Sequence, residues 1–287
     1  MAEGIVRTGT AGWVFAPWRG PFYPAGLTQK QELAYASAHL GAIEINATFR
    51  ALQKPQSFRN WASQTPEGFV FSIKGPQLVT HIKRLKDVET PLANFFASGP
   101  LALGTRLGPF VWQLPPNLSY DAERIEAFLA LLPKTPAEAA AFAGRHDDWL
   151  KDAATGTEGI STIRHAIEVR HASFANPDFI AQLLRHNVAL VAADTAEWPT
   201  LDVAADFVYC RLQGAPGRDS YEEADLERWA RRLAAWAEGT PMTDGQFVAE
   251  PPRATPRDVF AFFVSTDKVH APANAMAVAE RLRQTGG

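Results

Sequence analysis

The chain has 287 residues, of which 46% are hydrophobic and 21% charged, and 28 Lys and Arg against 31 Asp and Glu give a formal net charge of −3. This composition supplies enough apolar surface for a sizeable core and excludes the disordered and fibrous classes. The near-neutral charge argues against a general nucleic-acid coat and against a membrane-surface binder, because both need a surplus of cations.

The single cysteine, Cys210, leaves no intramolecular disulfide and no thiolate cluster, which is typical of a reducing compartment. The N-terminal residues carry no basic stretch followed by an apolar one, and the most apolar region, 91–115, is interrupted by prolines and polar residues. We therefore expect a cytoplasmic location and no membrane partner.

Short apolar runs alternate with helical patterns along the whole chain, which is typical of repeated βα units around a parallel sheet. Barrels of this kind commonly span about 250 residues as one unit. The pattern predicts an α/β fold, a single TIM-type (β/α)8 barrel over residues 1–287. The predicted strands are Ile5–Gly9, Ala42–Asn46, Phe69–Lys74, Phe110–Gln113, Ala166–Arg170, Ala189–Asp194, Phe207–Arg211 and Val259–Ser265.

The first strand is followed by a long aromatic loop that contains Trp13, Trp18, Phe22 and Tyr23, with Arg19 among them. Its rings and arginine suit stacking on a sugar or a base. The alternative is that this ordered loop simply covers the mouth of the barrel.

The helices between the strands are predicted by their caps and apolar stripes. Thr28 and Gln31 form a capping box, Asn176 and Pro177 begin a later helix, and Leu226, Trp229, Leu233 and Trp236 give the longest stripe. Residues 135–162 add a further helix and loop before the fifth strand, and we expect this insertion on the N-terminal face of the barrel, away from the chemistry.

Several predicted strands are apolar until their last residues, which are polar, and these ends converge on one mouth in a parallel barrel. Because side chains alternate along a strand, Glu168 and Arg170 share one side, as do Glu44 and Asn46. The mouth is therefore predicted to hold three carboxylates, three cations and two neutral hydrogen-bonding groups: Glu44, Glu168, Asp194, Lys74, Arg170, Arg211, Asn46 and Gln113.

Three interpretations of this mouth stay open. Glu44 and Glu168 suit general acid and base catalysis, because a shared desolvated site separates the pKa values of two carboxylates. Alternatively, the charges only pair with one another, as buried charges must. A divalent-metal site would use these glutamates and Asp194 with His81 or His171, although the close spacing of common metal motifs is absent from the sequence.

A glycine-rich loop follows the seventh predicted strand, where barrels often bind phosphate through backbone N–H groups. It runs from Gly214 to Arg218, and Arg211 and Arg218 would add positive charge. A plain turn is the alternative.

At these same positions the sequence resembles the YecE-like family, domain of unknown function 72. The matching motifs occur in family order over nearly the whole chain: Gly9-Thr10-Ala11-Gly12-Trp13, Trp18–Pro24, Glu44–Phe49, Lys74-Gly75, Thr80-His81, Arg84-Leu85, Trp112–Pro116, Glu168–His171 and Arg211-Leu212. The resemblance implies a TIM-type barrel and no assigned reaction. This sequence departs from the family pattern at Arg50, at Gln213 and at Phe263–Thr266 after the eighth strand.

The leading functional hypothesis is an enzyme that acts on a polar, sugar-like or phosphorylated small molecule, with Glu44 and Glu168 as acid and base. The predicted substrate-binding residues are Trp13, Trp18, Asn46, Lys74, His81, Gln113, Arg170, His171, Asp194 and Arg211. A non-catalytic ligand-binding barrel is the first alternative, suggested by the departures after the last strands. Nucleic-acid processing is the second, suggested by Trp13, Trp18, Arg19 and the stretch Arg84-Leu85-Lys86.

Overall fold

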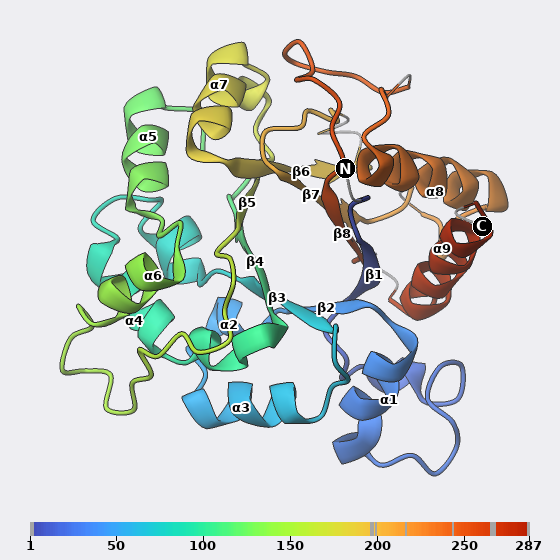
Figure 1. Cartoon of the computed structure of the whole chain (residues 1–287), viewed down its shortest axis with the longest axis horizontal. Helices are drawn as coiled ribbons and strands as arrows, with labels where there is room; N and C mark the ends of the chain where they lie inside the picture. Colours follow the sequence, from blue (N-terminus) through green and yellow to red (C-terminus); the bar gives the residue numbers. More distant parts are fainter. Residues whose placement is uncertain are drawn as a thin grey trace. The chain divides into compact units, whose positions relative to one another are not determined.

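The structure is a computed structural model that describes residues 3–195, 198, 200–215, 217–242, 244–264 and 268–285 (Figure 1). In this part of the chain, eight parallel strands follow one another in sequence order in a closed barrel, so the predicted TIM-type α/β fold is confirmed. The strands are β1 (Val6–Ala11), β2 (Ala42–Ile45), β3 (Val70–Lys74), β4 (Leu107–Gln113), β5 (His165–Glu168), β6 (Val188–Ala193), β7 (Phe207–Leu212) and β8 (Asp258–Phe263).

Helices separate consecutive strands except between β6 and β7, where the described residues form none. The α-helices are α1 (Glu32–His39), α2 (Ala47–Arg50), α3 (Pro55–Ser63), α4 (Glu89–Ala97), α5 (Ala122–Leu131), α6 (Pro136–Ala143), α7 (Pro177–His186), α8 (Glu223–Glu238) and α9 (Ala271–Thr285). Shorter segments are the 3₁₀-helices η1 (Ala16–Trp18), η2 (Gln29–Gln31), η4 (Pro100–Arg106) and η5 (Ala172–Phe174), and the π-helix η3 (Leu78–Ile82). None of the described helices is long and apolar enough to cross a membrane.

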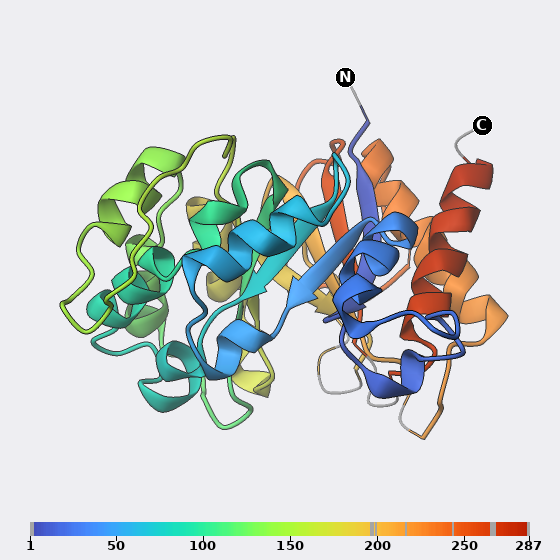
Figure 2. The same cartoon turned by 90° about the horizontal axis from the view of Figure 1, so that it is seen from below.

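The chain divides into two compact units, Met1–Glu44 with Ala175–Gly287, and Ile45–Phe174. In the first unit, β1 pairs with β2 and β8, and β7 pairs with β6 and β8. Helix α9 packs against α8 and β1 (Figure 2). The predicted apolar stripe of α8 is buried, and the helix ends at Gly239, whose φ of 73° suits a residue without a side chain.

In the second unit, β4 pairs with β3 and β5, and the register sets Gln113 opposite Glu168. The core between this sheet and its helices is aromatic. Phe95 packs edge-on against both Phe110 and Trp112, and Phe110 stacks on His165 at 5.5 Å between ring centroids. That the whole chain is a single domain stays a prediction.

All eight predicted strands overlap observed ones, and their ends differ. Strand β4 begins at Leu107 rather than Phe110, because pairing of Leu107 with Phe71 extends the strand through Gly108 and Pro109. Strand β5 ends at Glu168, so Arg170 lies just beyond it. The predicted end of the eighth strand at Ser265 falls outside the described residues.

The insertion contains the expected extra helix, α6, whose N-cap Thr135 accepts a hydrogen bond from the Glu138 amide at 3.2 Å. Its expected position on the N-terminal face holds for only part of it: Glu158 and Gly159 lie against Gly104 and Thr105, which precede β4, whereas another part lies elsewhere. Asp147 and Trp149 of the insertion line a cavity together with residues that follow the C-terminal ends of β2 and β3, such as Phe49 and Pro76. The insertion reaches this face because Asp147 is held by Asn94 of α4: the Asp147 amide donates to Asn94 Oδ1, and Asn94 Nδ2 donates to Asp147 Oδ1.

Candidate functional site

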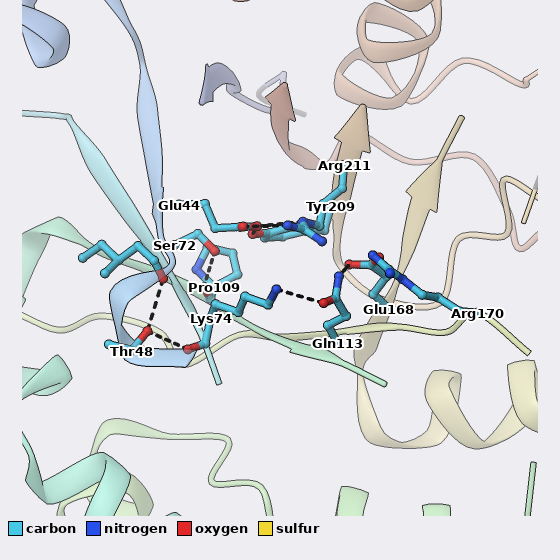
Figure 3. Close-up of polar contacts among 11 residues, drawn as sticks. Glu44, Thr48, Ser72, Lys74, Pro109, Gln113, Glu168, Arg170, Tyr209 and Arg211 are labelled. Atoms are coloured by element: carbon cyan, nitrogen blue, oxygen red, sulfur yellow. Dashed lines mark hydrogen bonds and ion pairs between the residues drawn. The ribbon is translucent and has the colours of Figure 1, made fainter. Parts of the chain in front are cut away.

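Strands β3, β4 and β5 end in four polar side chains that form a hydrogen-bonded series, here called the Glu168 cluster: Lys74, Gln113, Glu168 and Arg170 (Figure 3). Lys74 Nζ donates to Gln113 Oε1 at 2.9 Å, and Gln113 Nε2 donates to Glu168 Oε2 at 2.8 Å. Arg170 donates to Glu168 Oε1 through Nε at 3.1 Å and through Nη2 at 2.9 Å. The sequence prediction that these four residues lie together is therefore realised in this unit.

The Glu168 cluster is mostly buried and carries an excess positive charge. Lys74 and Glu168 are 8% and 3% exposed, whereas the Arg170 side chain is 40% exposed. Two cations and one carboxylate give the cluster a formal charge of +1. Lys74 Nζ also lies 4.3 Å from the ring centroid of Phe49, a cation–π contact that helps a buried ammonium to stay charged.

His81 lies beside this cluster on the π-helix η3. Its ring meets Phe49 edge-on at 5.0 Å, and its Nδ1 lies 2.9 Å from Thr80 Oγ1. Burial lowers the pKa of His81, the charges of Lys74 and Arg170 lower it further, and Glu168 opposes them. The imidazole is therefore neutral at pH 7 and able to accept a proton.

Three of the motifs behind the family resemblance contact one another in this unit. A Cβ on Gly75 would lie 2.2 Å from Cε3 of Trp112, so only glycine fits where the chain leaves β3 beside that ring. The Thr48 hydroxyl donates to the Lys74 carbonyl at 2.7 Å. These contacts fix the backbone that carries Lys74.

Glu44 belongs to a different group, here called the Glu44 cluster, with Tyr209 and Arg211 (Figure 3). The Tyr209 hydroxyl and Arg211 Nε donate to Glu44 Oε2 at 2.7 and 3.1 Å, and Arg211 Nη2 donates to Oε1 at 3.0 Å. Glu44 is 0% exposed, and both of its oxygens accept hydrogen bonds. This geometry is that of a buried ion pair, so it favours mutual pairing over proton transfer for Glu44.

Asp194 anchors the segment that follows β7. It accepts from the amides of Gln213 and Gly214 at 2.7 and 3.1 Å and from the Tyr221 hydroxyl. Burial, and then the charge of Asp194, raises the pKa of Tyr221. The predicted phosphate loop is a plain turn in its described part, because the Gly214 amide is bound to Asp194 and Arg218 pairs with Glu222 at 2.6 Å.

The first βα loop is ordered and folded on itself. Trp18 is 1% exposed, its indole N–H donates to the Lys268 carbonyl at 2.6 Å, and its ring packs edge-on against Phe22 and Tyr23. The enclosed ring favours a structural role for Trp18, and its binding of substrate stays a prediction. Trp13 is half-buried, and its carbonyl accepts from the Tyr23 hydroxyl at 2.5 Å.

A family model described as "Protein of unknown function DUF72" matches residues 7–287, nearly the whole chain. The chain belongs to the DUF72 family. Curated relatives of this DUF72 protein include the UPF0759 protein YecE of Escherichia coli K12, 27% identical over 135 residues, which are 47% of this chain and 46% of YecE. The UPF0759 protein YunF of Bacillus subtilis 168 is 24% identical over 185 residues, 63% of this chain and 56% of YunF. The matched part of the chain spans about half the length of these curated relatives.

Solved DUF72 structures share the fold. The crystal structure of a DUF72 family protein from Thermotoga maritima matches with a TM-score of 0.72 at 22% identity, covering 97% of this chain and 99% of that one. A DUF72 family protein from Enterococcus faecalis matches with a TM-score of 0.60 at 13% identity, covering 99% of both chains. At identities this low, the similarity shows a shared fold and says nothing of the chemistry.

Two further predicted residues of the DUF72 protein lie at strand ends and make local contacts. Asn46 is half-buried and directly precedes α2, and its carbonyl accepts from the Phe49 amide at 3.1 Å. His171 follows the Glu168 cluster in sequence, and its Nδ1 lies 2.8 Å from Ser173 Oγ. These local contacts account for both residues without assigning them a ligand.

The metal interpretation finds no support in the described ranges, where no three His, Cys, Asp or Glu side chains group closely enough to hold an ion. The oxygens of Glu44 and Glu168 instead face N–H and O–H donors from arginine, tyrosine and glutamine. Such donors compete with a cation for the same lone pairs.

Sequence reasoning missed two contributors to this region. Phe49 contacts both Lys74 and His81, although the motif Glu44–Phe49 was recognised only as part of the family resemblance. Trp149 lines the neighbouring cavity and is 70% exposed. A large aromatic residue within the charged stretch from Arg145 to Asp152 is the signal that identifies it.

Proposed function

We propose that this DUF72 protein is an enzyme acting on a polar small molecule that carries a phosphate or carboxylate group, and that the Glu168 cluster binds this anion. The observation that carries the proposal is the Arg170 guanidinium, which is held in place by Glu168 through two N–H groups and is still 40% exposed. A guanidinium oriented in advance loses little further freedom when it binds an anion.

The residues divide into binding, positioning and proton-transfer roles. Arg170 and Lys74 hold the anionic group, and Glu168 and Gln113 keep these two cations in position. His81 is assigned the proton transfer, because its lowered pKa leaves the ring neutral, whereas the Glu168 oxygens hold Gln113 and Arg170 in position.

The binding step is tested by a thermal-shift titration with inorganic phosphate and a panel of sugar phosphates. A ligand at a hundred times its Kd stabilises the native state by about 2.7 kcal/mol, which raises the Tm measurably. We expect the shift in the wild type and in Arg231→Gln, whose exposed α8 side chain makes the matched control, and its loss in Arg170→Gln. An equal shift in all three proteins would refute the assignment of Arg170.

Turnover of any compound that shifts the Tm is then followed by 31P or proton NMR. His81→Asn should lower the rate by about a hundredfold, as expected for loss of a general base, and leave binding intact. Since the His81 pKa lies below 6.5, the wild-type rate should fall only as the pH drops below that value. An unchanged rate in the variant would contradict the role of His81.

A non-catalytic binding barrel is the second candidate, favoured by Glu44, whose carboxylate is enclosed by Tyr209 and Arg211 and has no access to a ligand from solvent. Binding without turnover of any compound in the panel would favour it. Nucleic-acid processing is not proposed, because Trp18 is enclosed and Arg84 donates to the Asn117 carbonyl. We retain a small-molecule ligand and, from the single buried Cys210, a reducing compartment as proposals.

A further inference from the structure

A cavity of about 580 Å³ lies within the unit Ile45–Phe174, next to the Glu168 cluster but lined by other residues. Its walls come from four segments: α2 and the residues after it, the start of the segment after β3, the beginning of α4, and the insertion after α6. The lining residues are Phe49, Arg50, Ala51, Leu52, Pro76, Gln77, Leu78, Ile82, Thr90, Pro91, Asn94, Asp147 and Trp149. This volume is in the range of small-molecule sites, about 300–1,000 Å³.

The rim of the cavity concentrates exposed apolar side chains. Leu78, Ile82 and Trp149 are 42%, 65% and 70% exposed, and they are three of the six large hydrophobic residues exposed in the described part of the chain. Isolated exposed hydrophobic residues are ordinary, whereas a group of them around a concave site marks a binding surface.

The walls are held in place by polar contacts and by an uncommon backbone. Asn94 and Asp147 exchange two hydrogen bonds, and Asp147 Oδ1 also accepts from the Trp149 amide at 3.1 Å. Leu78 and Ile82, which also line the cavity, belong to the π-helix η3, and this helix is followed by left-handed Arg84 at φ 51°. Pi-helical turns and left-handed non-glycine residues cost energy and concentrate at functional sites.

Of the two charged residues that line the cavity, the cation Arg50 is the one suited to an acidic group on a ligand. Arg50 and Asp147 are its charged lining residues, and Asp147 Oδ1 accepts from the Asn94 side chain and the Trp149 amide. Arg50 is exposed and has no carboxylate within ion-pair distance among the residues that the structure describes. A flat apolar body against Trp149 with an acidic group toward Arg50 would satisfy both features.

We infer that this cavity is a second binding site, separate from the Glu168 cluster, for a small planar apolar acid such as an aromatic carboxylate or sulfonate. The inference stands independently of the proposed function, because no cation of the Glu168 cluster lines the cavity.

The test uses two fluorescent probes, the anionic 8-anilinonaphthalene-1-sulfonate and the neutral N-phenyl-1-naphthylamine. Trp149→Ala and Ile82→Ala should each weaken the binding of both probes about tenfold, because ring and apolar contacts are lost. Arg50→Gln should weaken the binding of the anionic probe alone, about fivefold, because a charged contact is lost. Leu184→Ala on α7, which removes another exposed hydrophobic side chain (43%) that does not line the cavity, is the control and should change neither.

Two outcomes would overturn the inference. One is probe binding in Trp149→Ala equal to that in Leu184→Ala. The other is a wild-type dimer that Trp149→Ala converts to a monomer in light scattering, because a second copy would then cover the cavity. Phosphate-induced thermal shifts should be the same in wild type and Trp149→Ala, which separates this result from failure of the anion site.

Discussion

His165 offers a sharp physical prediction, because it is a completely buried histidine with both ring nitrogens engaged. Its Nε2 lies 2.7 Å from the Pro133 carbonyl, and the Trp112 indole N–H donates to its Nδ1 at 3.2 Å. A neutral ring with the proton on Nε2 satisfies both contacts. A second proton on Nδ1 would face the indole N–H, so the site is built for the neutral form.

Burial therefore lowers the pKa of His165 from 6.5 to about 4, against the Pro133 carbonyl, which raises it. Between these values the unfolded chain binds more protons than the native state, so stability is lost as the pH falls below 6.5. The gap corresponds to about 3 kcal/mol when complete, and about 2 kcal/mol of it should be lost between pH 7.5 and pH 5.

The assay is urea unfolding at pH 7.5 and pH 5.0, followed by circular dichroism. His165→Gln keeps one donor and one acceptor without titrating, so its loss of stability over this range should be about 2 kcal/mol smaller than that of the wild type. His39→Gln, at an exposed position, should behave like the wild type. Equal losses in wild type and His165→Gln would refute this reasoning, whatever the absolute stability of the variant.

Three further substitutions test packing and positioning. Arg211→Met leaves a buried carboxylate without its cation and should cost about 3–5 kcal/mol in urea unfolding, and a cost below about 1 kcal/mol would contradict the ion-pair assignment. Asp194→Asn weakens the anchor of the segment 213–221, so limited proteolysis there should accelerate, and an unchanged cleavage rate would count against that anchor. Gly75→Ala forces a methyl group against the Trp112 ring and should lower the free energy of unfolding by about 1–3 kcal/mol. The near-ultraviolet circular dichroism spectrum should change as well, and an unchanged spectrum would disprove this close contact.

The fold was predictable because its signals are local. Each buried strand is a short apolar run, and the convergence of the ends of parallel strands correctly put Lys74, Gln113 and Glu168 together. Caps were equally readable, as at Asn176, whose side chain accepts from the Asp178 amide at 2.9 Å.

The partners of each polar group were not predictable, because they depend on contacts between distant segments. Glu44 and Glu168 look alike in the sequence, yet one is enclosed by Tyr209 and Arg211 and the other holds the half-exposed Arg170. Likewise, Trp18 has an enclosed ring and Trp149 an exposed one, although the residue type is the same. Only the tertiary contacts, such as those between Asn94 and Asp147, decide where the insertion lies.

The most direct test of the proposed anion site is isothermal titration of inorganic phosphate into the wild type, Arg170→Gln and the control Arg231→Gln. Loss of a charged hydrogen bond, worth about 1.5–3 kcal/mol, should raise the Kd of Arg170→Gln by roughly 10–100-fold and leave the control unchanged. Equal affinities for phosphate in all three proteins would contradict the proposal that the Glu168 cluster binds an anion. A wild type that binds neither phosphate nor carboxylates tested in the same way would also contradict it.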